Sequence, residues 1–267
     1  HTSQPSLSRQ IRDLEYQVGA ELLSRSVHGV ELTAAGKAFL DHARLALAQV
    51  DAAVEAARRA AQPARKTFAI GFLTGHEMNW LPRAMRVLRD ELKTIEVKVS
   101  SDYSPDLGEA LVRGRLDLAF LRVEPDHDLE YHVVDREPLI VLMPSDHRLT
   151  SREAIHPREF VGEIFIGGSN KATVLRAVTE DYLRRCGLDI KLDHGVDNLA
   201  MAMSLVASTR GLALMPAYAK NLMPWSVVSR PLEGEAPTIE LAIGYSKSNT
   251  SPILKLFVSR LDELVGP

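Results

Sequence analysis

Apolar and polar residues follow three successive patterns along the 267-residue chain, and each predicts a different kind of segment. Up to about residue 32, apolar residues recur at helical spacing and predict a helix with one buried stripe, formed by Leu7, Ile11, Leu14 and Val18. Pro5 suits the first turn of this helix and Gly19 ends it. Two short apolar pieces around His28 and Gly29 then predict a small hairpin, or wing.

The second segment, from Thr33 to about residue 61, predicts a single long helix. Alanine supplies 13 of the 31 residues from 34 to 64, and alanine is the strongest helix former. Spacings of four and three produce a coiled-coil seam that consists of Phe39, Ala43, Ala46, Val50, Ala53, Ala57 and Ala60. We expect this helix to pair with a second copy, the alternative being a helix packed on its own domain. Residues 62–66 read as a linker, because Pro63 breaks the helix.

The third segment, residues 67–267, alternates between strand and helix patterns. Expected strands span 68–73, 95–100, 117–121, 139–143, 164–166, 192–196, 213–215 and 239–245, and expected helices span 80–91, 105–113, 172–185, 199–208 and 253–264. Such alternation predicts parallel sheets. The length favours two small α/β lobes, the first of residues 67–143 and 246–267 and the second of residues 144–245.

Charge differs between the segments although the net charge is only −3. Residues 1–66 carry nine basic and seven acidic residues, a net charge of +2, and the other residues carry 23 basic and 28 acidic ones, a net charge of −5. A small basic unit on a larger acidic one is typical of a nucleic-acid reader joined to another domain.

A single cysteine, Cys186, excludes a disulfide framework and a cysteine-built zinc site, and it fits a reducing, cytoplasmic setting. No apolar run reaches about 18 residues, so we expect no membrane span. The first residues lack an initiator Met and read as the continuation of a longer chain.

The first helix carries polar residues suited to DNA, namely Gln4, Ser6, Ser8, Arg9 and Arg12. Gln and Ser can read base edges in the major groove, and Arg neutralises phosphate. On the residues alone, an ordinary polar surface helix explains this pattern equally well.

Three motifs change that balance. SQPSLSRQIRDLE, GAELLSRS and GVELTAAGKAFL follow one another in order, and together they closely resemble the winged helix-turn-helix of LysR-type transcriptional regulators. The resemblance is dense over residues 1–61 and holds at the level of pattern beyond them. It implies that the chain starts at the recognition helix and that earlier helices of the DNA-binding domain lie upstream of His1.

The resemblance implies an α+β multi-domain fold. It consists of a partial winged helix-turn-helix (1–32), a linker and dimerisation helix with its hinge (33–66), and a two-lobed α/β effector domain (67–267) that resembles periplasmic binding proteins. The implied DNA contacts are Ser3, Gln4, Pro5, Ser6, Ser8, Arg9, Arg12, Arg25 and His28. His28 stands at the wing tip, where many members of the family carry Arg, and a largely neutral His weakens that contact.

A ligand site is expected in the third segment, at the carboxyl ends of strands. Helix N-termini there favour anions. Each corner alone is readily explained as a helix cap, and the resemblance implies that the corners meet at one cleft. The expected effector contacts are Thr74, Gly75, Ser104, Arg122, Gly168, Thr173, Val174 and Asn198. We expect these corners to carry no clustered carboxylates, Glu77 being the nearest, which favours a carboxylate or sulfonate effector.

Catalytic sites find little support. The nine histidines lack metal-binding spacings, no Gly-x-Ser-x-Gly motif exists, and Gly167-Gly168 lacks the Lys of a phosphate-binding loop. We therefore predict no catalytic residues, no metal and no cofactor. Cys186 reads as a packed residue, with a thiol-based redox sensor as the minor alternative.

The sequence thus indicates a transcriptional regulator that is not an enzyme. Its expected partners are double-stranded DNA, a small-molecule effector, further copies in a homodimer or homotetramer, and RNA polymerase. The chief alternative is a small-molecule solute-binding protein without DNA function, which residues 67–267 alone would allow and residues 1–61 oppose. A cleft enzyme is a third candidate.

Overall fold

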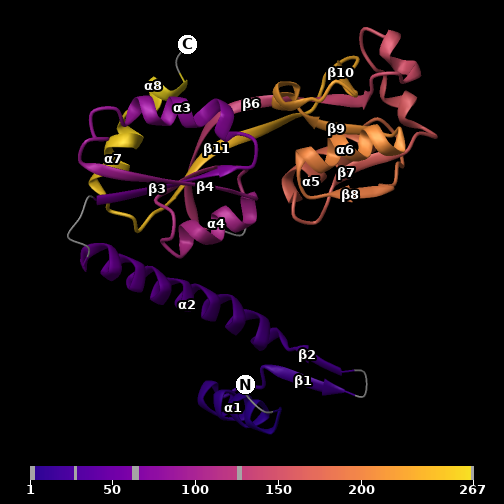
Figure 1. Cartoon of the computed structure of the whole chain (residues 1–267). Coiled ribbons are helices and arrows are strands. Elements are labelled where there is room, and N and C mark those ends of the chain that lie inside the picture. The colour runs from indigo at the N-terminus through magenta and orange to yellow at the C-terminus, as the bar shows by residue number, and fades with distance from the viewer. Residues whose placement is uncertain (1–3, 27–28, 62–65, 125–127, 266–267) are drawn as a thin grey trace. The chain divides into compact units, whose positions relative to one another are not determined.

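The computed structural model describes residues 4–26, 29–61, 66–124 and 128–265. The chain forms two compact units, His1–Val54 and Glu55–Pro267 (Figure 1). Each unit is described separately below.

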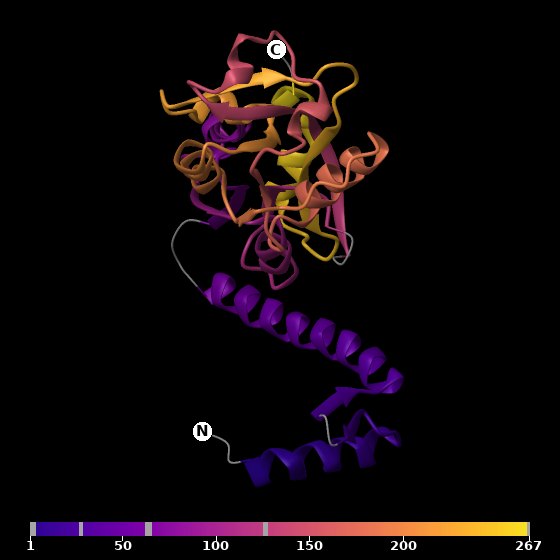
Figure 2. The same cartoon turned by 90° about the vertical axis from the view of Figure 1, so that its right-hand side faces the viewer.

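The first unit contains a helix, a hairpin and the first part of a long helix. Its elements are α1 (Gln4–Val18), β1 (Leu23–Ser26), β2 (Gly29–Leu32) and α2 (Ala34–Ala61), which continues into the second unit. The two strands pair antiparallel, with Leu23 opposite Leu32. Figure 2 shows α2 as one uninterrupted helix. The predicted order of helix, wing and long helix is therefore confirmed.

Local polar contacts explain where these elements begin and end. The Glu15 carboxylate accepts the backbone N–H groups of Leu22 (2.8 Å) and Leu23 (3.0 Å), which ties the hairpin to α1. Thr33 caps α2, since its Oγ1 accepts the N–H of Gly36 at 2.9 Å. Gly36 is required there, because an added Cβ would overlap the Leu22 carbonyl oxygen.

The stripe predicted to be buried on α1 is not buried within the described residues. Leu7 and Val18 are 54% and 41% exposed, and Ile11 and Leu14 are only half-buried. The hairpin and the start of α2 are the other elements of this unit, so α1 has little apolar surface to pack against.

The second unit is built on a mixed sheet. Its strands are β3 (Lys66–Leu73), β4 (Ile95–Asp102), β5 (Leu118–Leu121), β6 (Leu129–Pro144), β7 (Phe165–Gly168), β8 (His194–Val196), β9 (Leu212–Pro216), β10 (Val227–Pro231) and β11 (Thr238–Ser246). They follow the order β4-β3-β5-β11-β6-β9-β7-β8, and β10 pairs with β6. The helices are α3 (Glu77–Val87), α4 (Ser104–Val112), α5 (Thr173–Arg185), α6 (Leu199–Thr209), α7 (Pro252–Ser259) and α8 (Leu261–Val265). Three 3₁₀ helices are η1 (Arg148–Ser151), η2 (Pro157–Phe160) and η3 (Ala217–Leu222).

The expectation of purely parallel sheets is wrong. β3 is parallel to β4 and β5, and β7 is parallel to β8 and β9. However, β11 is antiparallel to β5 and β6, and β6 is antiparallel to β9 and β10. The strand expected at 139–143 begins ten residues earlier, at Leu129, and the closing helix expected at 253–264 is divided into α7 and α8.

The long strands β6 and β11 run from one lobe to the other (Figure 1). Residues 139–142 of β6 already pair with β9 in the second lobe, and residues 242–244 of β11 pair with β5 in the first. The lobe boundaries expected after residues 143 and 245 fall near the ends of these two shared strands.

Each lobe has helices on both faces of its part of the sheet. In the first lobe, Trp80 of α3 and Phe257 of α7 share a core with Phe120, while Leu107 of α4 packs on the other face. In the second lobe, alternate side chains of β6 enter different cores: Leu139, Val141 and Met143 lie on the α5 side, and Ile140 and Leu142 lie on the α6 side.

Candidate functional site

One cavity of about 80 Å³ collects most of the expected ligand contacts. Seven of the eight line it, namely Thr74, Ser104, Arg122, Gly168, Thr173, Val174 and Asn198. Gly75 does not line the cavity. Its φ of +93° shapes the turn after β3, and an added Cβ would meet the Tyr218 ring at 3.1 Å.

Strand and helix ends bring these residues together. Thr74 and Arg122 directly follow β3 and β5, and Ser104 begins α4. From the second lobe, Gly168 ends β7 and Thr173 begins α5. The cavity therefore lies where strands end and helices begin in both lobes, the usual ligand position in open α/β sheets.

Several of these side chains already serve the fold. The Ser104 hydroxyl oxygen accepts the backbone N–H of Arg122 at 2.9 Å, and Asn198 Oδ1 accepts the N–H of Met201 at 2.8 Å. Asn198 is thus the N-cap of α6, which agrees with the helix-cap explanation of this corner. A hydroxyl that accepts one bond still has its own proton to donate, so Ser104 can serve a ligand as well.

The expectation that this cleft lacks clustered carboxylates is wrong. Glu124 and Asp197 both line the cavity. The Thr173 hydroxyl donates to the Glu124 carboxylate (3.0 and 3.2 Å), and the Ser169 hydroxyl donates to Asp197. Glu77, expected to be the nearest acid, instead accepts the N–H of Gly75 at 2.7 Å and lies outside the lining. Glu124 and Asp197 could have been noticed because each adjoins a predicted corner, Arg122 or Asn198.

Arg122 joins a buried cluster behind the cavity. Its Nη2 donates to Glu137 Oε2 at 2.7 Å, and His76 Nε2 lies 3.2 Å from the same oxygen. Burial alone would raise the pKa of Glu137, but the hydrogen bond with His76 and the charge of Arg122 outweigh it, so that pKa is lowered. Burial lowers the pKa of the His76 imidazole, against the opposing effect of Glu137. Neither His76 nor Glu137 is among the expected effector contacts.

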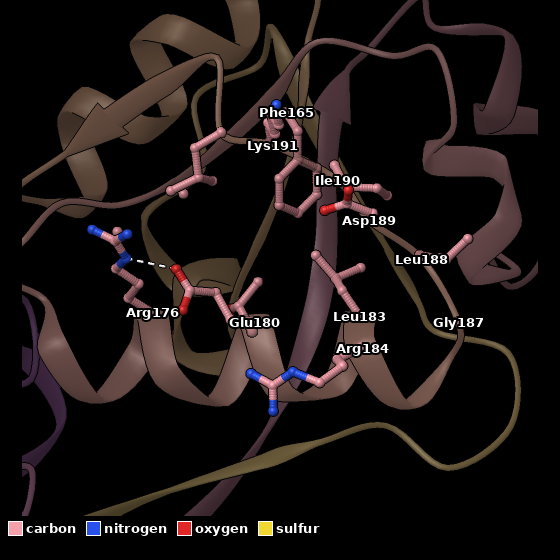
Figure 3. A pocket seen from close by; sticks show the side chains of 14 residues that line it. Phe165, Arg176, Glu180, Leu183, Arg184, Gly187, Leu188, Asp189, Ile190 and Lys191 are labelled. Carbon is pink, nitrogen blue, oxygen red and sulfur yellow. Dashed lines mark hydrogen bonds and ion pairs between the residues drawn. The ribbon is translucent and has the colours of Figure 1, made fainter.

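A second, wider hollow of about 770 Å³ lies along α5 (Figure 3). Its wall includes Phe165 and Leu183, and Arg176 on its rim is paired with Glu180 at 2.7 Å. Of the expected ligand contacts, only Gly168 lines this hollow. The convergence of predicted residues therefore favours the cavity between the lobes.

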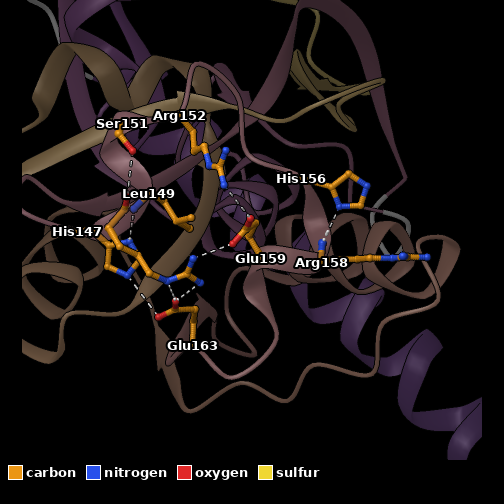
Figure 4. A network of polar contacts seen from close by, with 9 residues as sticks. His147, Leu149, Ser151, Arg152, His156, Arg158, Glu159 and Glu163 are labelled. Carbon is orange, nitrogen blue, oxygen red and sulfur yellow. Dashed lines mark hydrogen bonds and ion pairs between the residues drawn. The ribbon is translucent and has the colours of Figure 1, made fainter.

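Another polar network joins η1 to the segment around η2 (Figure 4). Arg148 bonds Glu159 and Glu163, each at 2.8 Å, and His147 Nε2 lies 3.3 Å from Glu163. His147 Nδ1 also accepts the N–H of Leu149. Each of these contacts fastens one short turn to another, so the network explains how this part of the second lobe is held.

The first unit presents part of the expected DNA surface. Arg9 and Arg12 are exposed and Ser8 is half-buried, with Arg12 Nε bonded to the Ser8 carbonyl oxygen at 3.3 Å. Gln4, Pro5 and Ser6 belong to the first turns of α1 and Arg25 belongs to β1, but their side chains are not described. Ser3 and His28 lie outside the described residues.

Neither a metal site nor a membrane-spanning helix is found in the part of the chain that the structure describes. No group of three or more His, Cys, Asp or Glu side chains there could hold a metal ion. No helix there is both long enough and apolar enough to cross a bilayer.

Comparison with known families gives two matches. Residues 61–265 match the LysR substrate binding domain, and residues 1–37 match the bacterial regulatory helix-turn-helix protein of the lysR family. The second match argues against a solute-binding protein without DNA function.

Individual relatives agree. HcaR, the Hca operon transcriptional activator of Escherichia coli, is 32% identical over 98% of this chain and 89% of its own length. The regulator AlsR of Bacillus subtilis is 30% identical over 96% of this chain and 85% of its own length. The crystal structure of CbnR, a LysR family transcriptional regulator, has a TM-score of 0.64 and 21% identity, covering 97% of this chain and 90% of CbnR. Full-length BenM has a TM-score of 0.63 and 25% identity, covering 98% and 86%.

Proposed function

The chain belongs to the LysR family of transcriptional regulators. We propose that it binds operator DNA through α1 and the hairpin, and that it responds to a small carboxylate or sulfonate. The family binds DNA and small-molecule effectors, and the chain is a regulator rather than an enzyme. The observation that carries the effector proposal is the cavity to which both lobes contribute polar groups, with Arg122 in its lining.

The acid group of the effector is proposed to bind on the Arg122 side of the cavity. Arg122 supplies a cation, Ser104 has a proton to donate, and α4 begins at Ser104 with its N-terminal backbone donors. Val174 and Leu199 supply apolar wall for the rest of the molecule.

The carboxylates of the cavity restrict this pose. Glu124 and Asp197 repel a second negative group, so they are proposed to face a neutral or donor-bearing part of the effector. A carboxylate or sulfonate with its single charge at one end suits this arrangement better than a dianion.

For DNA, α1 is proposed to enter the major groove. Gln4, Ser6 and Ser8 are assigned to base edges, Arg9 and Arg12 to phosphates, and Arg25 and His28 to the wing contact. The structure of CbnR with its target DNA is similar to this chain, with a TM-score of 0.64. DNA binding also implies that the protein acts in the cytoplasm, where the operator is.

The protein is proposed to act as a homodimer or as a tetramer of two dimers, paired through α2. Apolar side chains on α2, among them Leu47, Val50 and Val54, are exposed in the single chain, and a second α2 would cover them. Effector binding is proposed to change the angle between lobes or dimers, and thereby DNA bending and the recruitment of RNA polymerase.

Two measurements test this function. Retention of the protein on double-stranded DNA should be strong at low salt and fall steeply as salt rises. A thermal-shift screen of aromatic and aliphatic carboxylates, sulfonates and matched neutral amides should find stabilisation by acids, since a ligand at about 100 times its dissociation constant adds ~2.7 kcal/mol. Stabilisation by the amides and not by the acids would contradict the effector class.

A further inference from the structure

Four polar side chains from both lobes form one cluster at the cavity, two of them in its lining and two buried behind it. His76 precedes α3, Arg122 follows β5, Glu137 lies on β6 where that strand crosses between the lobes, and Tyr218 belongs to η3. The rings of His76 and Tyr218 lie with their centroids 3.8 Å apart. Arg122 and Tyr218 line the cavity, and His76 and Glu137 lie behind them, 1% and 6% exposed.

The cluster has hydrogen-bonding capacity left over. Among the described residues, Arg122 Nη1 and His76 Nδ1 are the two buried side-chain nitrogen or oxygen atoms without a partner. Leaving such an atom unpaired is costly, and an arginine donor is satisfied best by an anion. The guanidinium of Arg122 thus bonds Glu137 through Nη2, whereas its Nη1 is buried without a partner.

Without an effector, the charges of the cluster sum to zero, and an anionic effector would add one negative charge. Arg122 is positive, Glu137 is a carboxylate with a lowered pKa, and His76 is a histidine whose pKa burial lowers, so its ring is neutral at pH 7. An effector acid group at Arg122 would leave one buried negative charge uncompensated, which is unfavourable in a low-dielectric site.

His76 is the group placed to restore the balance. Its Nε2 lies 3.2 Å from Glu137 Oε2 and 3.3 Å from Arg122 Nη2. Tyr218, on the other side of the ring, stays protonated because burial raises its pKa to about 12. Glu77, the neighbour on α3, is engaged by the N–H of Gly75. We propose that binding of the effector's acid group at Arg122 is coupled to uptake of one proton from solvent by His76, an inference that rests on the proposed anionic effector.

Protein variants test the charge coupling without any effector. Arg122→Gln removes a positive charge from the cluster and so imitates the arrival of an anion. In this variant, the pKa of His76 should rise by about 1–3 units. The pKa is measured by NMR titration of the labelled imidazole, whose signal is assigned with His76→Gln. Glu137→Gln should lower it, which keeps the test open should Arg122→Gln fail to fold. Arg136→Gln, which removes an exposed arginine of β6 that is paired with Glu240 of β11, should leave the pKa of His76 unchanged.

Ligand binding tests the coupling itself. Benzoate is the probe and benzamide, of the same shape without the charge, is its control. Calorimetry of the full chain at pH 7 in phosphate and in Tris should show proton uptake with benzoate, none with benzamide, and none with benzoate in His76→Gln. Benzoate affinity should rise as pH falls from 8 to 6, by at most about tenfold per unit.

The two proposals can fail separately. Absence of benzoate binding would count against the carboxylate class, and the Arg122→Gln titration would then decide the coupling alone. An unchanged pKa of His76 in Arg122→Gln, or benzoate binding without proton uptake, would overturn the coupling.

Discussion

A hydroxyl in the cleft can form its hydrogen bonds with the backbone, with a neighbouring acid or with a ligand. Ser104 and Thr173 differ in these partners. The Ser104 hydroxyl accepts the backbone N–H of Arg122 and can still donate a hydrogen bond, whereas the Thr173 hydroxyl already donates its hydrogen bond to Glu124. Ser104→Ala should cost roughly ten- to a hundredfold in effector affinity and, by leaving a buried N–H unpaired, about 1–3 kcal/mol of stability.

Calorimetry with the best acid from the screen, together with chemical denaturation, measures both effects of Ser104→Ala. Thr173→Val should abolish the response because it removes the hydroxyl that donates to Glu124, while Thr173→Ser should preserve it. DNA binding should survive in every case, because α1 belongs to the other unit. Wild-type affinity in both Ser104→Ala and Thr173→Val would mean that these residues are only helix starts and that the effector binds elsewhere.

The buried imidazole of His76 makes stability depend on pH. Its pKa in the folded protein lies below the usual histidine value of 6.5, so the unfolded chain binds more protons than the folded one between these two values. The free energy of unfolding should therefore be highest above pH 6.5 and decrease as pH falls below it. Denaturation from pH 8 to pH 5 should show this decrease, and His76→Gln should flatten it. An equally steep decrease in the variant would assign the effect to other groups.

At the residue scale, most of the residues that meet at the proposed effector cavity could be predicted from local sequence patterns. Thr74, Ser104 and Thr173 each stand where a strand pattern gives way to a helix pattern, and such positions gather at one edge of a sheet. The pairing of Thr173 with Glu124, 49 residues apart in sequence, is set by how the two lobes meet. No local pattern reports that geometry, so the negative charge of the cleft was missed.

At the element scale, the prediction concerns the pairing of α2 with the α2 helix of a second copy. Val50 is 60% exposed in the single chain and lies in the middle of the predicted seam. A charge buried there between two helices would be unpaired and would cost several kcal/mol. Val50→Glu should therefore shift the protein toward monomer in analytical ultracentrifugation. Gln49→Glu adds the same charge on the neighbouring exposed residue and should leave the dimer intact. An undiminished Val50→Glu dimer would place the pairing surface elsewhere.

Elements were predicted well where one segment meets one core. The helix expected at 172–185 is observed as Thr173–Arg185, because most of its apolar side chains, Tyr182 and Leu183 among them, pack into one core. The first half of β6, residues 129–138, was missed: several of its side chains, including Glu130 and Val133, are exposed, so no apolar run marks it. Its antiparallel pairing with β11 joins residues 100 or more positions apart, which a sequence pattern does not record.

At the scale of the whole molecule, the opposite charges of the two parts separate their roles. Residues 1–66 carry a net charge of +2 and residues 67–267 carry a net charge of −5, so the net charge of residues 67–267 does not favour binding to DNA. Arg9 is exposed on α1 and Arg89 is exposed on the second unit. Removing either changes the net charge equally, and only Arg9 is proposed to meet phosphate.

Arg9→Ala should consequently weaken binding to all DNA sequences alike and reduce the slope of log affinity against log salt by about 1, whereas Arg89→Ala should change neither. Gln4→Ala should instead relax base preference at one half-site position, because a bidentate contact to a base edge is worth about 1–3 kcal/mol of discrimination. Binding isotherms over a salt series, with footprinting on a selected operator, separate these outcomes. Equal losses from Arg9→Ala and Arg89→Ala would show that attraction to DNA follows the net charge of the molecule. Unchanged affinity and base preference in both α1 variants would remove α1 from the DNA interface.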